Sequence, residues 1–167
     1  MIKKLILVLA VMLPMSVFAQ KFGVVDLDAI MQAMPETAAA QETINEASKK
    51  YETEFQKLQD ELQKRYAEFQ TIQDDPETPQ TIKERRMQEI QTLAGNVDNF
   101  RQTASQDLQR QHEQLMAPIQ QRLMEAIKAV GQDGGFTFIM PNESILLYTG
   151  STVINVTNDV KAKLGVK

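Results

Sequence analysis

Two kinds of hydrophobic pattern occur along the chain. A short β-rich run, Phe22–Asp26, is followed almost at once by a long stretch with helical periodicity. A lone strand is unstable in water, because its backbone N–H and C=O groups need a neighbouring strand. We predict that the run FTFIM at 136–140 is that partner and that ILLY at 145–148 completes a small sheet. The residues in between must therefore leave the sheet and return to it.

The intervening stretch, residues 36–130, has the composition of a helix and is rich in Gln, Glu, Lys, Leu and Ala. Its one clear break is DDPETPQ at 74–80, where two prolines exclude a continuous helix. The pattern predicts an outgoing helix from Glu36 to Asp74, a tip loop at 74–80, and a returning helix to about residue 130. Together these form an arm of two helical legs.

Each leg of the arm carries an apolar stripe. On the outgoing leg the apolar positions recur in steps of 3 and 4 with an 11-residue period, which keeps the stripe nearly parallel to the helix axis. The returning leg has the same spacing. The predicted seam consists of Tyr51, Phe55, Leu58 and Leu62 on the outgoing leg and of Leu93, Val97, Phe100 and Leu108 on the returning leg.

The two stripes match each other if the legs fold back antiparallel. Facing residues then have position numbers with a constant total, and Phe55 with Phe100 and Leu58 with Val97 both total 155. Two stripes of equal period can be aligned in several ways. This alignment, however, has its midpoint inside the proline loop, which was located on separate grounds. We therefore predict an antiparallel helical hairpin.

The two ends of the chain, 20–35 and 131–167, form the predicted body. Asp28 is predicted to cap a short helix Ala29–Met34, and Thr157 or Asn155 to cap a last helix that ends before Gly165. The fold class is α+β and mostly α, and so small a body needs partners, which predicts oligomerisation through it. The residues expected to pack the body are Val24, Val25, Leu27, Phe136, Phe138, Ile139, Leu146 and Leu147.

Residues 1–19 have the pattern of a secretory signal peptide. Lys3 and Lys4 precede an apolar run, Leu5–Leu13, and Val17–Ala19 form a small-x-small cleavage site. The apolar run is shorter than the roughly 20 residues that a membrane span needs. We expect export to the periplasm with cleavage after Ala19.

Charge and composition exclude several function classes. Without Lys3 and Lys4 the chain has 16 basic and 22 acidic side chains, which argues against nucleic acid as the main partner. There is no cysteine and only one histidine, His112, which we interpret as packing beside the seam. The pair Asp26 and Asp28 is interpreted as a strand end and a helix cap rather than a metal site. With no phosphate loop and no nucleophile beside a base, the sequence indicates a binding module without cofactor or metal, not an enzyme.

Four segments carry a family resemblance: FGVVDLDAIMQAMPE, LMAPIQQRLMEAIKAV, FTFIMPNESILLYTG and VTNDVKAKLG. In their order along the chain they resemble the Skp/OmpH family of periplasmic chaperones, over essentially the whole mature chain. The resemblance implies a homotrimer with a β-rich body and three hairpin arms around a cavity. It also implies that unfolded outer-membrane proteins are held there, without ATP, during transit across the periplasm. Members of the family are often basic, whereas residues 36–130 have 12 basic and 17 acidic side chains. Despite the basic run Lys83–Arg86 at the tip, this balance puts contact with anionic membranes in doubt.

Two function hypotheses remain: a holdase for unfolded proteins, and a structural spacer that tethers envelope components. A spacer would require an uninterrupted rigid coil and a docking motif at its tip. Pro118 interrupts the returning leg, because it lacks the N–H that would bond to the carbonyl of residue 114, at a cost of roughly 3 kcal/mol. It is either a static kink or a hinge at the base of the arm, and the sequence leaves both readings open.

Overall fold

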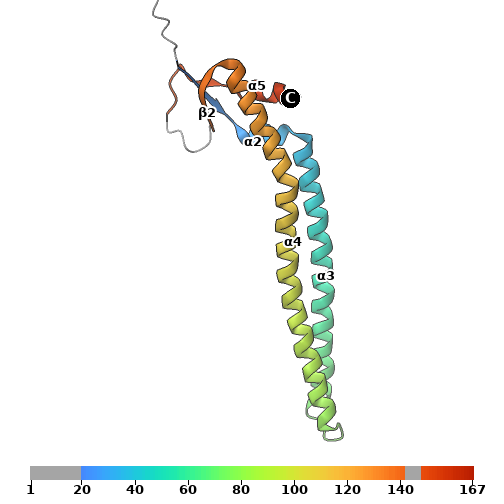
Figure 1. The fold of residues 1–167 in the computed structure, drawn as a ribbon. Helices are drawn as coiled ribbons and strands as arrows, with labels where there is room; N and C mark the ends of the chain where they lie inside the picture. The colour runs from blue at the N-terminus through green and yellow to red at the C-terminus, as the bar shows by residue number, and fades with distance from the viewer. Residues whose placement is uncertain (1–19, 142–147) are drawn as a thin grey trace, which may run out of the picture.

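The structure is a computed structural model that describes residues 20–141 and 148–167, so the predicted signal peptide lies outside the described residues. Two long helices lie side by side and project as an arm from a small body (Figure 1). In chain order the elements are β1 (Lys21–Val25), α2 (Leu27–Ala33), α3 (Pro35–Gln73), α4 (Gln80–Gly134), β2 (Phe136–Pro141), β3 (Ile154–Asn155) and α5 (Thr157–Leu164). The predicted helical hairpin is confirmed.

The sheet of the body has β1 in the middle, in the order β2-β1-β3, and both pairs are parallel. β2 pairs with β1 over Phe22↔Phe138 to Val25↔Pro141, which confirms the predicted partner of the first strand. The third strand of the described sheet is β3, not the predicted run at 145–148. Tyr148 of that run lies in a non-strand segment with 85% of its surface exposed, and 145–147 lie outside the described residues.

The parallel direction of β2 follows from the unequal lengths of the two long helices. Parallel neighbours need a crossover connection, and here the whole arm serves as one. α4 has 55 residues and α3 has 39, so α4 returns past the start of α3 and reaches the beginning of β1. Lys21 Nζ there donates a hydrogen bond of 3.0 Å to the carbonyl of Gly134. Gly135, at φ 65°, then turns the chain into β2 in a left-handed conformation that favours glycine.

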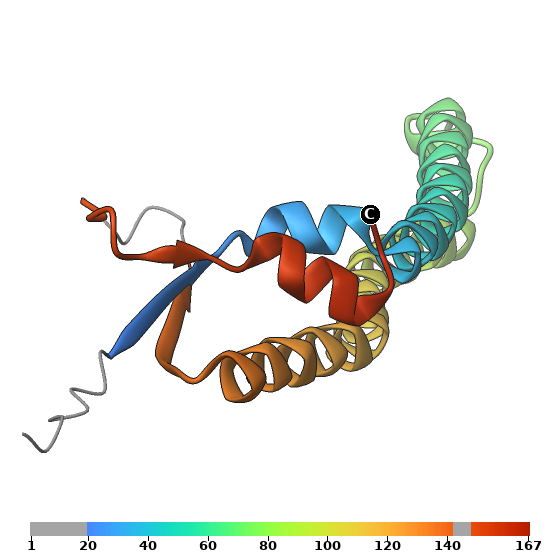
Figure 2. The same cartoon turned by 90° about the horizontal axis from the view of Figure 1, so that it is seen from above.

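The hydrophobic core of the body lies mainly between helices rather than on the sheet. α2 and α5 lie side by side and pack against the last part of α4 (Figure 2). The core residues are Val25, Ile30, Met34, Ala40, Ile119, Leu123, Ala126, Val156, Val160 and Leu164. α4 is therefore shared: its first part belongs to the arm, and from Ile119 onward its buried side chains belong to the core of the body.

The cap of α2 is Asp26, so the prediction of Asp28 as the cap is wrong. Asp26 has the extended backbone that an N-cap needs, and its Oδ1 accepts a 2.8 Å hydrogen bond from the amide of Ala29. Asp28 falls in the first helical turn instead. The amide of Asp26 also donates to Thr157 Oγ1 at 3.0 Å, which ties the end of β1 to the start of α5. The N-cap of α5 is Val156, which has no side-chain cap hydrogen bond, so the prediction of Thr157 or Asn155 as the cap is wrong; Asn155 Oδ1 accepts a 2.9 Å hydrogen bond from the amide of Thr157, the first residue of the helix.

Candidate functional site

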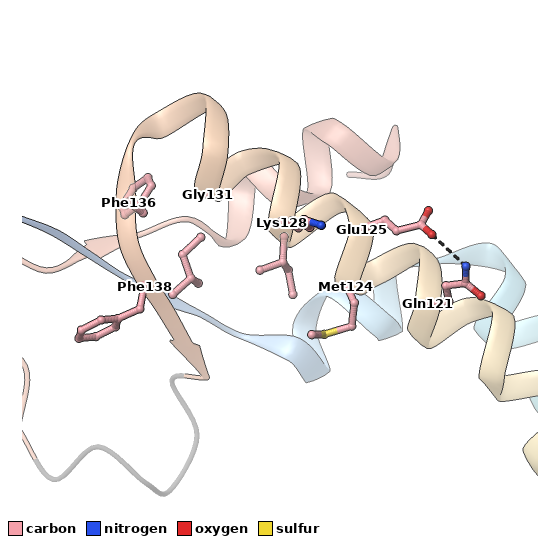
Figure 3. A pocket seen from close by; sticks show the side chains of 9 residues that line it. Gln121, Met124, Glu125, Lys128, Gly131, Phe136 and Phe138 are labelled. Atoms are coloured by element: carbon pink, nitrogen blue, oxygen red, sulfur yellow. Dashed lines mark hydrogen bonds between the residues drawn. The ribbon is translucent and has the colours of Figure 1, made fainter.

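An apolar hollow lies on the body between α4 and β2, with a volume of about 470 Å³ (Figure 3). Phe136, Phe138 and Ile139 line it from β2, and Met124 and Ile127 line it from α4. Met124 is 62% exposed and Phe138 48% exposed, although both are large apolar side chains. Exposed apolar side chains gathered around one hollow are typical of a surface that contacts another protein.

The body residues singled out from sequence divide into two groups. Val24 and Val25 are buried, at 6% and 2% exposure, within the chain's own fold. The ring of Phe138 lies against Phe22, tilted by 35° with 4.7 Å between the centroids, and Phe138 is still 48% exposed. Leu27, Phe136 and Ile139 are partly buried against the core, and Leu146 and Leu147 lie outside the described residues.

A second apolar hollow, of about 380 Å³, lies where the arm meets the body. It is lined by Ala39 and Ala40 on α3 and by Leu115, Pro118 and Ile119 on α4. α4 continues as one helix through Pro118 but changes direction near the base of the arm (Figures 1 and 2). The hollow and the proline thus coincide at the junction of arm and body.

Arg122 links the helices that meet at this junction, and sequence reasoning missed it. One guanidinium nitrogen, Nη1, pairs with Glu36 at the start of α3, and Nη2 donates at 3.0 Å to the carbonyl of Leu164 at the end of α5. One side chain therefore connects three helices. Arg122 follows the buried Ile119 by three positions, but its partners are 86 and 42 residues away and have no local signature.

In the middle of the arm, a polar contact joins the two helices. Tyr51 of α3 donates a 2.6 Å hydrogen bond to Asp107 Oδ2, and Gln111 Nε2 donates to the same oxygen at 2.5 Å. Arg110 pairs with the other carboxylate oxygen. The hydrogen bond from Tyr51 is the largest cause that holds the pKa of the Asp107 carboxyl below its usual value, and the same bond raises the pKa of Tyr51. We call Tyr51, Asp107, Arg110 and Gln111 the arm clasp.

The contacts of Tyr51 in the arm clasp also show where the predicted seam residues lie. The ring of Tyr51 meets Phe100 edge-on at 6.0 Å between centroids, while its hydroxyl reaches Asp107. These two contacts lie on either side of Ala104, the buried residue that the alignment totalling 155 puts opposite Tyr51. Val97 is buried as well, and the other seam residues predicted from sequence (Phe55, Leu58, Leu62, Leu93, Phe100 and Leu108) are partly buried.

The tip of the arm is held by hydrogen bonds that use its charged groups. Asp75 accepts from the amide of Glu77 at 3.1 Å and from Thr78 Oγ1 at 2.6 Å. Lys83 Nζ donates to the carbonyls of Gln73 and Asp75, at 2.9 and 2.8 Å, and so caps the end of α3. The hydrogen bond from Thr78 is the main cause that lowers the pKa of Asp75, followed by the Glu77 amide.

The remaining cations of the predicted basic run also have partners within the arm. Arg85 and Arg86 both pair with Glu89, at 3.0 and 2.8 Å, on the same helix. All three cations of the run Lys83–Arg86 therefore have hydrogen-bond or ion-pair partners within the arm. None of the helices in the described part of the chain is both long and apolar enough to cross a membrane.

The candidate metal ligands and the histidine do not come together. Within residues 20–141 and 148–167, no three or more His, Cys, Asp or Glu side chains are grouped as a metal site would require. His112 is exposed on α4 and does not pack in the seam, because Gln111 beside it turns toward the arm clasp.

Asp75 gives the tip a pH dependence of definite sign. A carboxyl whose pKa is lowered by folding stabilises the folded loop above its unfolded pKa of about 3.9, and this contribution is lost as the pH falls through the folded pKa. We expect Asp75→Ala to speed hydrogen exchange of the Glu77 amide at neutral pH and to have little further effect well below pH 3.9. The control, Asp74→Ala, removes the same charge one residue earlier. Equal effects of the two variants at neutral pH would contradict the assignment.

Comparison with known proteins identifies the family. The model of the family described as outer membrane protein (OmpH-like) matches residues 21–164. A crystal structure of a protein described as an OmpH-like outer membrane chaperone, from Caulobacter crescentus CB15, matches with a TM-score of 0.71 and 13% identity. That match covers 87% of this chain and 83% of the other, and at this identity it shows a shared fold. No curated protein matches the chain. Since the family match spans most of its length, the chain belongs to the OmpH-like outer membrane protein family.

Proposed function

We propose that this protein is a periplasmic holdase chaperone that binds unfolded outer-membrane proteins and prevents their aggregation without ATP. Family membership supports the proposal, as does the description of the Caulobacter protein, which has the same fold, as an outer membrane chaperone. The lack of a glycine-rich phosphate loop in the sequence is in keeping with a process that uses no nucleotide. Residues 1–19 would be removed during export to the periplasm.

The observation that carries the proposal is the arm itself. α3, with 39 residues, would be about 58 Å long at 1.5 Å per residue, and it packs against α4 along a single seam. Most of its surface therefore faces outward instead of contributing to a core. The surface of the arm offers an unfolded chain many weak contacts, including half-exposed apolar side chains such as Tyr66 on α3 and Ile82 on α4.

We propose that further copies of this chain cover the apolar hollow of the body, around Met124 and Phe138, in a homotrimer. The exposure of these two side chains supports an interface there, and the number three comes from the family resemblance. Val25 is a poor position at which to test assembly, because it is buried within one chain and a charge there would disturb folding first.

Assembly can be tested with Phe138→Glu combined with Met124→Glu. A carboxylate at each position would have to be buried in the interface, so we expect the oligomer to dissociate while each chain keeps its helical content. Tyr66→Glu is the matched control, because Tyr66 is similarly exposed, at 45%, but lies on the arm. Light scattering or native mass spectrometry gives the mass, and an unchanged oligomer in the double variant would overturn this interface.

The holdase function is tested by diluting a urea-denatured β-barrel membrane protein into buffer with and without the mature protein, in the absence of nucleotide. We expect the turbidity of the client to fall in proportion to the chaperone added. A tethering spacer would leave the turbidity unchanged, and that result would overturn the proposal. A denatured soluble protein, used in parallel, shows whether the protection is selective for outer-membrane clients.

We propose that Pro118 is a hinge at the base of the arm. Two observations support a boundary at this position: Ile119, the next residue, is buried in the body's core, and Pro118 lines the hollow at the junction. The segment after the proline is thus anchored by buried side chains, whereas Leu115 and Met116, just before it, contact the core as partly buried side chains. A swing at this point would let one cage accept clients of different volume.

Pro118→Ala restores a backbone donor and a good helix former, so α4 should straighten and stiffen. We expect unchanged or higher thermal stability, an intact oligomer and a narrower spread of dimensions in small-angle scattering. Capacity for large clients should fall more than capacity for small ones. Pro35→Ala is the control, because Pro35 begins α3, where a missing N–H costs little. A variant with the wild-type scattering profile and wild-type capacity for both client sizes would reduce Pro118 to a static kink.

A further inference from the structure

The apolar seam of the arm does not by itself select one register. In the alignment totalling 155, Leu62 faces Leu93 and Leu58 faces Val97. If one helix slides by seven residues, the total becomes 162, and its midpoint moves from the proline loop to residue 81, so the first turns of α4 would have to open. Leu58 then faces Ala104, Leu62 faces Phe100, and Phe69 faces Leu93. Apolar side chains still meet apolar side chains, because a seven-residue shift is close to two helical turns.

Polar contacts between the helices differ from the seam in this respect, because each requires two particular atoms to meet. In the described chain, side-chain hydrogen bonds between α3 and α4 occur at the base (Arg122 to Glu36), in the middle (Tyr51 to Asp107) and at the tip (Lys83 to the Gln73 carbonyl). The other ion pairs along the arm join residues three or four positions apart on one helix. Pairs within one helix form in any register.

We propose that the arm clasp, together with the proline loop at the tip, fixes the register of the hairpin, with Tyr51 and Asp107 as the positioning residues of the clasp. Asp107 accepts hydrogen bonds from Tyr51 and Gln111 and pairs with Arg110, and only 16% of its side chain is exposed. After a seven-residue slide Tyr51 would face Gln111, and Asp107 would lie beside Phe55. The carboxylate would then lose the tyrosine donor against an apolar ring, which is costly for a shielded charge.

The tip and base contacts are less suited to this role. Lys83 bonds to free carbonyls at and just after the end of α3, and this contact requires no particular side chain on that helix. The pair of Arg122 and Glu36 is half exposed, at 50% and 43%, and exposed ion pairs contribute little. The clasp alone combines a particular donor with a shielded acceptor. A single polar contact in an apolar seam is a known means of specifying register in coiled coils.

Two cysteine pairs that share position 93 measure the register directly. Leu62→Cys with Leu93→Cys reports the native register, and Phe69→Cys with Leu93→Cys reports the slid one. In the native hairpin the second pair is displaced by seven residues, or about 10.5 Å along the axis, beyond the Cα separation of roughly 4.4–6.8 Å that a disulfide allows. We expect the native arm to form only the first disulfide, and both pairs lie away from the clasp.

In Tyr51→Phe combined with Asp107→Leu, we expect loss of this selectivity. The disulfide between positions 69 and 93 should go from absent to readily detected, while helical content and thermal stability stay level or rise. Asp107→Asn keeps an acceptor for Tyr51, so only the disulfide between positions 62 and 93 should form. This variant distinguishes a role of the clasp in register from a role in packing alone. Asp98→Leu is the control for adding an apolar residue on an exposed face of α4.

Exclusive formation of the native disulfide in the double variant would overturn the proposal, as would equal slippage in Asp98→Leu. If the double variant loses its helical content, Tyr51→Phe alone, which keeps the ring against Phe100, provides the same readout. A native-only pattern in that single variant would then overturn the role of Tyr51. None of these outcomes depends on client binding.

Discussion

Strand β1 has no partner strand near it in sequence. The rest of the structure depends on how its backbone N–H and C=O groups find hydrogen-bond partners. Both of its partners lie more than a hundred residues further along the chain, and both run parallel to it. A parallel pair needs a crossover, and this chain extends the crossover into a long hairpin. The sheet can therefore form only when α3 and α4 bring Gly134 back to Lys21. The body and the arm must therefore fold together. Closing so long a loop between β1 and β2 has an entropic cost, and the pairing of the two long helices offsets it.

The two legs pair through two different kinds of interaction with separate consequences. The apolar stripe supplies most of the attraction, since burial of apolar surface is non-directional and tolerates sliding. The polar contacts add little net stability, because in water they replace hydrogen bonds to solvent. Their geometric demands, however, let them discriminate between alignments that the stripe leaves nearly equal. Apolar side chains thus hold the two helices together, and polar side chains select their register. A buried asparagine in a coiled coil has the same selecting role, at some cost in stability.

The sequence predicted what depends on period and on backbone chemistry. The hairpin followed from the 11-residue period and the proline loop, and the pairing of β1 with β2 followed from the need for a second strand. The cap of α2 was placed two residues late, because Asp26 and Asp28 are chemically equal and only backbone conformation separates them. Phe138 was expected to pack within the body, yet it is half exposed, because a hydrophobic residue on a strand of a small sheet can face outward as well as inward. Arg122 and the arm clasp were not predicted at all, since they join polar residues tens of positions apart and leave no periodic trace.

The division of α4 between arm and body limits how the two can influence each other. After Pro118 the buried side chains of Ile119, Leu123 and Ala126 fix the helix to α2 and α5. Met124 and Ile127, which line the exposed hollow, belong to that fixed segment. Rotation at the proline would leave the hollow unmoved, so an interface there could persist while the arms change their angle. Two contacts join this fixed segment to the start of α3: Ala40 packs in the core of the body, and Arg122 pairs with Glu36. An arm that swings must therefore stretch the exposed pair, at a small cost, and must also shift Ala40 against the core of the body.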